Sequence, residues 1–201
     1  MDLLLDAANF STLLVSMVLK LPQIVLLVNS RSSRGLSLPS LFLELSGFVI
    51  FLAYQMYYGY PAPTYFEYPI LVIQDLLLLL LVLYYNGYLG LSIIFYASLC
   101  LVAIKVITLK DWIIDICMAC CTMVGVGSKL AQLGSLWKSQ DSGQLSAATW
   151  AMAMYTSAAR IFTTFMTTQD FAVLLRFTLM LLLNFWVLCT IIRFRNKRKL
   201  E

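Results

Sequence analysis

Four polar side chains interrupt long apolar stretches at positions where a charge or an amide is costly: Lys20, Asp75, Lys129 and Asn184. An ionised side chain at the centre of a membrane-spanning helix costs about 2.5–3.5 kcal/mol on insertion scales, so it faces a bundle interior or a wet cavity. A carboxylate there can accept a proton or hold a substrate, and a lysine can attract a phosphate or carboxylate group. The alternative is an internal ion pair, for which Asp75 and Glu44 are the candidate partners of Lys20.

The four positions are related by an internal repeat with an offset of 109 residues. Lys20 falls on Lys129 and Asp75 falls on Asn184, with no gap between the two matches. Over the first 18 positions from Lys20, 8 are identical in the second copy, and three of these are serines. Chance similarity between two apolar helices would repeat Leu and Val rather than Lys, Gln and Ser. The sequence therefore predicts two copies of one unit, each with two of the four polar residues.

Pro22 lies two positions after Lys20 and predicts a kink in the first apolar helix. Proline has no backbone N–H and clashes with the preceding turn, so it loosens or bends a helix. Gln23 and Gln132 occupy matching positions and are candidates to cap the freed backbone. A kink at this position could act as a hinge, with Pro22, Gln23 and Gln132 as its candidate residues; the family resemblance described below implies that role. A static kink, whose freed carbonyl is satisfied by neighbouring helices, is the alternative.

The composition excludes several kinds of chemistry. The chain has no histidine, which rules out histidine bases and histidine metal ligands. Cys117, Cys120 and Cys121 lie in an apolar run rather than the polar, exposed setting that metal or redox chemistry needs. No nucleophile–base set or phosphate loop can be assembled either. We therefore expect no enzyme activity, no catalytic residue, no metal and no cofactor.

Apolar runs broken by Pro, Gly and charge predict membrane-spanning helices. The chain is 61% hydrophobic and 12% charged, whereas soluble domains are about 45–50% apolar and about 25% charged. About 20 apolar residues cross a bilayer as a helix, so 201 residues have room for several crossings joined by short loops. The predicted spans are residues 8–29, 37–58, 66–86, 89–109, 112–137, 146–167 and 171–194.

The repeat predicts how these spans are arranged. The first and fifth spans are an even number of crossings apart, so both copies point the same way through the membrane, as in some secondary carriers. The predicted fold is an all-α membrane protein with seven transmembrane helices, built as two parallel three-helix bundles joined by a linker helix (3+1+3). Its parts are a first repeat at residues 8–86, a linker transmembrane helix at 89–109, a second repeat at 112–194 and a basic cytosolic tail at 195–201.

The distribution of Lys and Arg predicts the orientation. The tail and the loops on its side hold eight basic residues, and the opposite loops hold only Lys105 and Lys110. This places the C-terminus in the cytosol and the N-terminus in a lumen. Lys197 and Lys199 resemble the dilysine retrieval signal of endoplasmic reticulum membrane proteins. The expected location is the endoplasmic reticulum membrane, with an endolysosomal membrane as the alternative.

The sequence resembles the PQ-loop repeat family, which includes cystinosin and relatives of the SWEET sugar transporters. The resemblance rests on Pro22-Gln23, the polar loop that follows and Gly35-Leu36-Ser37-Leu38, and on the duplication and seven-span pattern. Within that family, the stretch from Lys20 to Leu43-Glu44-Leu45 resembles the mannose-P-dolichol utilization defect proteins. The second copy departs from the family pattern, with Ala131 in place of proline, so we do not expect a symmetrical hinge in both halves.

The resemblance implies two functions of different classes. The first is a carrier that moves a small polar organic solute by alternating access, with a swinging half-helix at Pro22 and proton coupling at Asp75 as an option. The alternative is a non-carrier factor that binds or flips dolichol-phosphate-linked sugars for glycosylation in the endoplasmic reticulum. A cargo or sensing receptor is a third and weaker hypothesis. For the carrier, the predicted substrate and proton pathway contains Asp75, Asn184, Lys20 and Lys129.

The expected partners are the lipid bilayer and either a small polar solute or a lipid-linked sugar. No nucleic acid is expected, because the only dense basic run is the short tail. Gly125, Gly127 and Ser128 predict a surface for close helix packing, either inside one protomer or in a homo-oligomer. Arg160 and Arg176 are expected to extend toward the lumenal interface, as long basic side chains near helix ends do. For Arg176 the alternative is an ion pair with Glu67, which occupies the matching position of the first repeat.

Overall fold

The computed structural model describes residues 2–31, 38–87, 105–139 and 147–200, and in these ranges its regular elements are all helices. Residues 89–104 of the predicted linker span at 89–109 lie outside the described residues. The elements are α1 (Asp2–Leu19), α2 (Leu21–Ser30), α3 (Leu38–Tyr57), the short 3-10 helix η1 (Ala62–Thr64), α4 (Glu67–Tyr85), α6 (Asp111–Ser139), α7 (Ala147–Thr167) and α8 (Phe171–Leu200).

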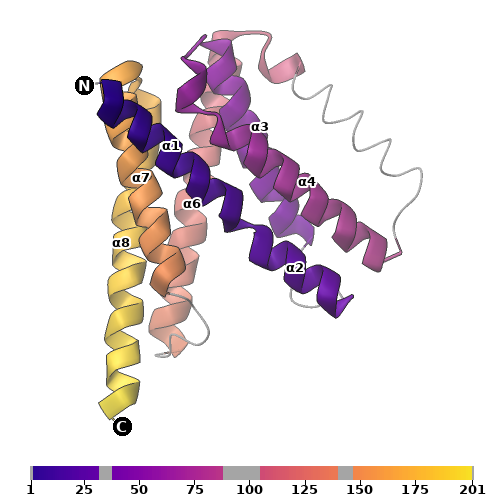
Figure 1. The fold of residues 1–201 in the computed structure, drawn as a ribbon, viewed down its shortest axis with the longest axis vertical. Helices are drawn as coiled ribbons and strands as arrows, with labels where there is room; N and C mark the ends of the chain where they lie inside the picture. The colour runs from indigo at the N-terminus through magenta and orange to yellow at the C-terminus, as the bar shows by residue number, and fades with distance from the viewer. Residues whose placement is uncertain (1, 32–37, 88–104, 140–146, 201) are drawn as a thin grey trace. The chain divides into compact units, whose positions relative to one another are not determined.

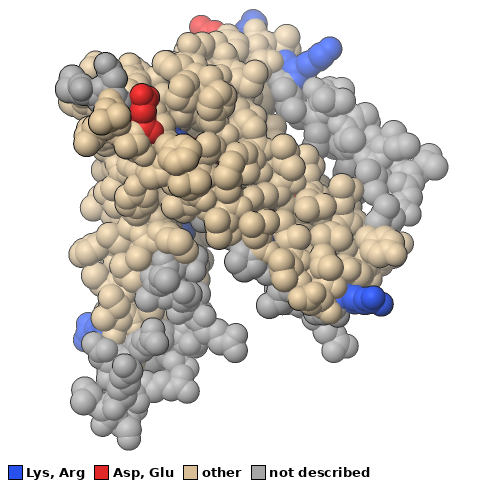
Figure 2. All heavy atoms as spheres, in the orientation of Figure 1, with Lys and Arg blue, Asp and Glu red and all other residues tan. Residues whose placement is uncertain are grey.

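Several helices are apolar and long enough to cross a membrane. By length and composition, the described residues contain four such stretches, with Leu41–Tyr57 as a shorter apolar helix. Large hydrophobic side chains such as Leu109, Met123 and Ile73 are exposed, which is the pattern of a surface that faces lipid. On the face drawn in Figure 2, Lys, Arg, Asp and Glu form only a few small patches. The four stretches are Leu3–Asn29, Glu67–Tyr85, Asp111–Lys138 and Phe171–Phe194.

The chain divides into two compact units. The first unit is Phe10–Met118, and the second is Ala119–Glu201 together with Met1–Asn9. In the first unit, α4 packs against α2 and α3; in the second, α7 packs against α8 (Figure 1).

The hydrophobic cores of the two units are related by the offset of the sequence repeat. Six buried residues form the first core and seven form the second. Four positions of the first core fall on four positions of the second at the offset of 109, although the side chains differ in size. The matched pairs are Leu27 with Leu136, Leu41 with Trp150, Leu78 with Val187, and Val82 with Ile191.

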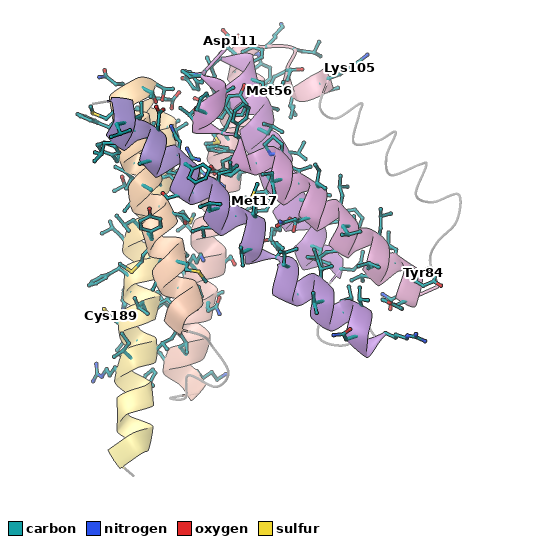
Figure 3. The ribbon with its side chains drawn as sticks, viewed as in Figure 1. Met17, Met56, Tyr84, Lys105, Asp111 and Cys189 are labelled. Carbon is teal, nitrogen blue, oxygen red and sulfur yellow. The ribbon has the colours of Figure 1, made fainter. Side chains whose placement is uncertain are left out.

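Two tyrosines at the end of α3 bind the beginning of α6 within the first unit. The Tyr57 hydroxyl donates to Asp111, and the Tyr58 hydroxyl donates to Asp115 Oδ1 at 2.8 Å. Partial burial, followed by the hydrogen bond to Asp115, raises the pKa of Tyr58 to about 12. The phenol therefore keeps its proton and stays a donor at physiological pH. Met56 and Asp111 lie at this end of the unit, and Tyr84 lies at the other end of α4 (Figure 3).

Gly125 marks a close approach of two helices inside the second unit. A Cβ atom at this position would lie 2.7 Å from Cε of Met180 on α8. The small residue at position 125 thus admits the end of a flexible side chain from a helix of the same chain. For Gly125, the close packing expected of this surface occurs within the protomer.

Candidate functional site

The first apolar helix is broken at Lys20. Helix α1 ends at Leu19 and α2 begins at Leu21, with Lys20 between them at φ −99° and ψ −12° (Figure 1). Pro22 stands in the first turn of α2, where a missing backbone N–H does least harm. The first hydrogen bond of α2 then runs from the Ile24 N–H to the Lys20 carbonyl at 3.0 Å. The proline thus starts a new helix and leaves Lys20 at the join.

A side chain from α4 satisfies a backbone group that the break leaves free. In an unbroken helix, the Met17 carbonyl would accept a hydrogen bond from the N–H four residues later. Here the Gln74 side-chain amide donates to the Met17 carbonyl at 3.0 Å, and Met17 lies near the end of α1 (Figure 3). Gln74 therefore fastens the break to α4 at the position directly before Asp75. Sequence reasoning did not assign this role to Gln74, and the capping roles of Gln23 and Gln132 stay predictions.

The Lys20 ammonium joins two carboxylates from two different helices. Its Nζ lies 2.6 Å from Glu44 Oε2 on α3 and 2.8 Å from Asp75 Oδ1 on α4. The side chains of Lys20 and Asp75 are 6% and 0% exposed, whereas that of Glu44 is 42% exposed. Both candidate partners of Lys20 are therefore in contact with it. We call these three residues the charge cluster.

The charge cluster holds two acidic groups and one basic group. Asp75 Oδ2 is buried and accepts no hydrogen bond from any residue that the structure describes. The ring of Phe48 is 6.0 Å from the Lys20 ammonium and adds an apolar wall with a weak attraction for the cation. When all three groups are ionised, the cluster carries one net negative charge. Such a cluster can exchange a proton or attract a cationic group.

The second repeat has no carboxylate at the two positions that match Glu44 and Asp75. Lys129 lies within α6, which continues unbroken through Ala131, and its Nζ lies 4.1 Å from the centre of the Trp150 ring. The position that matches Glu44 is Ala153, and the position that matches Asp75 is Asn184. A lysine that faces two carboxylates in one repeat thus faces an aromatic ring in the other.

Asn184 is buried as deeply as its counterpart in the first repeat. The residue is almost wholly buried on α8, and its Oδ1 accepts no hydrogen bond from the described residues. A buried amide oxygen without a donor is costly, so it is a natural acceptor for a ligand or a water molecule. Lys20 and Asp75 belong to the first unit, whereas Lys129 and Asn184 belong to the second. The hypothesis that all four line one pathway stays a prediction.

Arg160 on α7 is buried and binds Asn9. It is only 2% exposed, and its Nη1 donates to Asn9 Oδ1 at 3.1 Å within the second unit. The extension of Arg160 toward the lumenal interface stays a prediction. Arg176 donates to Thr122 Oγ1 at 3.5 Å, which links α8 to α6.

Comparison with known proteins agrees with this arrangement. Residues 4–64, which contain the break and Glu44, match the model of the PQ loop repeat. The chain is 53% identical to human solute carrier family 66 member 3 over 193 residues, which cover 96% of this chain and 95% of that protein. Its fold matches a solved eukaryotic SWEET transporter with a TM-score of 0.69 at 16% identity, over 96% of this chain and 99% of the other.

The match to the SWEET structure shows that the two proteins share a fold, and the identity to the human protein is high along nearly the whole chain. Together with its apolar helices, these findings identify an integral membrane protein of the transporter type. The chain belongs to the PQ-loop repeat proteins of solute carrier family 66.

Proposed function

We propose that this protein moves a small polar organic solute across a membrane by alternating access, with proton coupling through the charge cluster. The observation that carries the proposal is the position of Lys20, at a helix break and in contact with two carboxylates. A change in the charge of this cluster would act on the backbone join itself. Charge exchange and helix movement are thereby linked in one place, which a proton-coupled carrier requires.

The same cluster argues against the lipid-linked sugar hypothesis. In that hypothesis, Lys20 and Lys129 would bind the phosphate of a dolichol-linked sugar, and the geometry bears on Lys20. The Lys20 ammonium is already held by Glu44 and Asp75 at 2.6 and 2.8 Å, and an incoming phosphate would meet two carboxylates. A phosphate that reached the Lys20 ammonium would lie within a few ångströms of both carboxylates. Because like charges this close repel each other strongly in a membrane interior, a phosphate is a poor ligand for Lys20.

The finer architecture belongs to the same proposal. Two parallel three-helix repeats joined by a linker transmembrane helix would form the carrier, with Asp75, Asn184, Lys20 and Lys129 along its pathway. The matched cores of the two units support a common origin of the repeats. The basic tail supports a cytosolic C-terminus and residence in the endoplasmic reticulum membrane, with Asn9 on the lumenal side.

Ligand-dependent thermal stabilisation tests the proposal. The purified protein would be placed in liposomes and melted with amino acids, sugars and polyprenyl-phosphate sugars in turn. A ligand present at about 100 times its Kd should raise the free energy of unfolding by about 2.7 kcal/mol. We expect a small solute to stabilise the wild type but not Asp75→Asn, and uptake of that solute into the liposomes to follow the same pattern.

The Asp75→Asn variant is suited to this test because it leaves one lysine and one carboxylate in contact. The fold should therefore survive, and Asp6→Asn, which changes an exposed carboxylate, is the control. Stabilisation by the polyprenyl lipid alone would favour the glycosylation hypothesis. If Asp75→Asn unfolds the protein while Asp6→Asn does not, Asp75 serves the fold rather than transport.

A further inference from the structure

We infer that Glu44 is a positioning residue: it binds Lys20 in competition with Asp75 and thereby lets Asp75 take up a proton. This inference deepens the proposed function, because it assigns the control of the proton site to a residue on a different helix. The inference rests on the proposed function in that a carrier would use this proton to drive transport. The titration described below, however, needs no substrate. The two ideas can therefore fail separately.

The first step is the balance of charge. One ammonium cannot neutralise two carboxylates, and both carboxylates touch the same nitrogen atom. The charged groups that the structure places beside Asp75 are Lys20 at the α1–α2 join and Glu44 on α3. Glu67 is the nearest other acid on α4, two turns away, where Thr12 donates to it at 3.3 Å. One proton on the charge cluster makes it neutral.

The second step is the choice of the carboxylate that takes the proton. Glu44 is 42% exposed, so part of its charge can remain solvated, whereas Asp75 is fully buried. Burial disfavours the charged form of an acid, and the Oδ2 atom of Asp75 has no hydrogen-bond donor among the described residues. The contact between Lys20 and Glu44 is also the shorter of the two. Asp75 is therefore the acceptor of the proton, and Glu44 keeps the lysine engaged.

The third step is the effect of removing Glu44. With glutamine at position 44, Lys20 faces a single carboxylate, and the pair is neutral without any added proton. Asp75 would then stay ionised to a lower pH. Two charges a few ångströms apart at a protein effective dielectric shift a titration by about one pH unit or more, which is a tenfold change in proton affinity.

Infrared spectroscopy of the protein in lipid nanodiscs tests the inference. The C=O stretch of a protonated carboxyl group is followed during a pH titration, and isotope-labelled aspartate separates Asp signals from Glu signals. We expect an Asp band that is absent in Asp75→Asn. In Glu44→Gln the same band should appear at a pH lower by about one unit or more. Glu44→Asp, which keeps the charge, should lie closer to the wild type, and Glu67→Gln should move the band far less.

The opposite assignment has its own signature. A band that comes from Glu, disappears in Glu44→Gln and moves in Asp75→Asn would overturn the inference. So would an Asp75 band that titrates at the same pH with and without Glu44. Should Glu44→Gln fail to fold, the isotope label still decides the assignment: an Asp band that is lost in Asp75→Asn supports the inference, and a Glu band overturns it. A normal titration pattern in a protein that moves no solute would reject the carrier and retain the role of Glu44.

Discussion

Lys20 links the join between α1 and α2 to two further helices through one nitrogen atom. It stands at the end of α1, directly precedes α2, and reaches Glu44 on α3 and Asp75 on α4. Gln74 adds a second link from α4 to the same join, through the Met17 carbonyl. A change at Lys20 would therefore alter both the charge beside the helix break and the packing of α3 and α4 against it.

Replacement of Lys20 by methionine should destabilise the protein strongly. Removal of one partner from a buried ion pair leaves an uncompensated charge, which costs about 3–5 kcal/mol. The loss should be larger at mildly alkaline than at mildly acidic pH, since low pH allows the two carboxylates to become neutral by protonation. Denaturant or thermal unfolding in detergent micelles measures the change at both pH values.

The repeat offers a matched control for this change. Lys129→Met removes the equivalent lysine of the second unit, which is less buried and lies over the Trp150 ring. A cation–π contact contributes about 0.5–2 kcal/mol, so the expected loss is smaller than for Lys20→Met. Equal losses in the two variants would contradict the assignment of the charge cluster to the first repeat alone.

At the scale of helices, the proline at position 22 and the alanine at the matching position 131 give the two repeats different backbones. The join at Lys20 precedes a proline, whereas α6 runs without interruption past Ala131. Proline inside a helix removes a hydrogen bond and costs about 3 kcal/mol or more. The break is thus encoded locally, and its absence from the second repeat follows from the alanine.

Exchange of these two residues tests whether the break is a functional hinge. Pro22→Ala should leave the protein as stable or more stable, because α1 and α2 can then share hydrogen bonds, but it should slow solute uptake. Ala131→Pro should lower the free energy of unfolding by about 3 kcal/mol. In Pro22→Ala, slower hydrogen exchange around residues 17–22 would show that α1 and α2 share hydrogen bonds. In Ala131→Pro, thermal unfolding measures the loss of stability. Unchanged uptake in a well-folded Pro22→Ala protein would show that the kink is static.

Much of the helical pattern could be predicted from the sequence, since apolar runs and their breaks are local signals. The predicted spans at 37–58 and 66–86 lie close to α3 and α4. The first helix begins at Asp2, before the predicted start, and α8 extends to Leu200, because polar residues can continue a helix beyond its apolar part.

The candidate site was only partly predictable, for a different reason. Glu44 and Asp75 could be proposed as partners of Lys20 because a buried lysine needs a carboxylate at a similar depth. The bond from Gln74 to the Met17 carbonyl depends on the rotation of α4 about its own axis, which no local pattern records. The bond from Arg160 to Asn9 could not be predicted for the same reason, because it joins residues that are far apart in the sequence.

At the scale of the whole molecule, the repeat conserves the pattern of burial more closely than it conserves charge. Four core positions match at the offset of 109, and buried Asp75 falls on buried Asn184. The charge cluster has no counterpart, because the position of Glu44 is taken by Ala153. A common scaffold in which one repeat carries the carboxylates of the charge cluster is consistent with a carrier in which a single unit handles the proton.

The orientation of the chain in the membrane can be tested at the two ends of α6. This helix has 29 residues, which at about 1.5 Å per residue is longer than the ~30 Å hydrocarbon core of a bilayer. Lys110 precedes it and Lys138 lies in its last turn, and both side chains are exposed. The excess of basic residues on the side of Lys138 predicts that this end is cytosolic.

Single cysteines at these two positions, in a host without the five native cysteines, provide the measurement. In sealed microsomes, a membrane-impermeant thiol reagent should label Lys138→Cys at once. It should label Lys110→Cys only after detergent opens the membrane, because that residue would then face the lumen. The reverse pattern would invert the orientation and place the basic tail in the lumen, where a dilysine signal cannot be read. Labelling of both sites in intact microsomes would mean that α6 does not cross the membrane, and the parallel arrangement of the two repeats would fall with it.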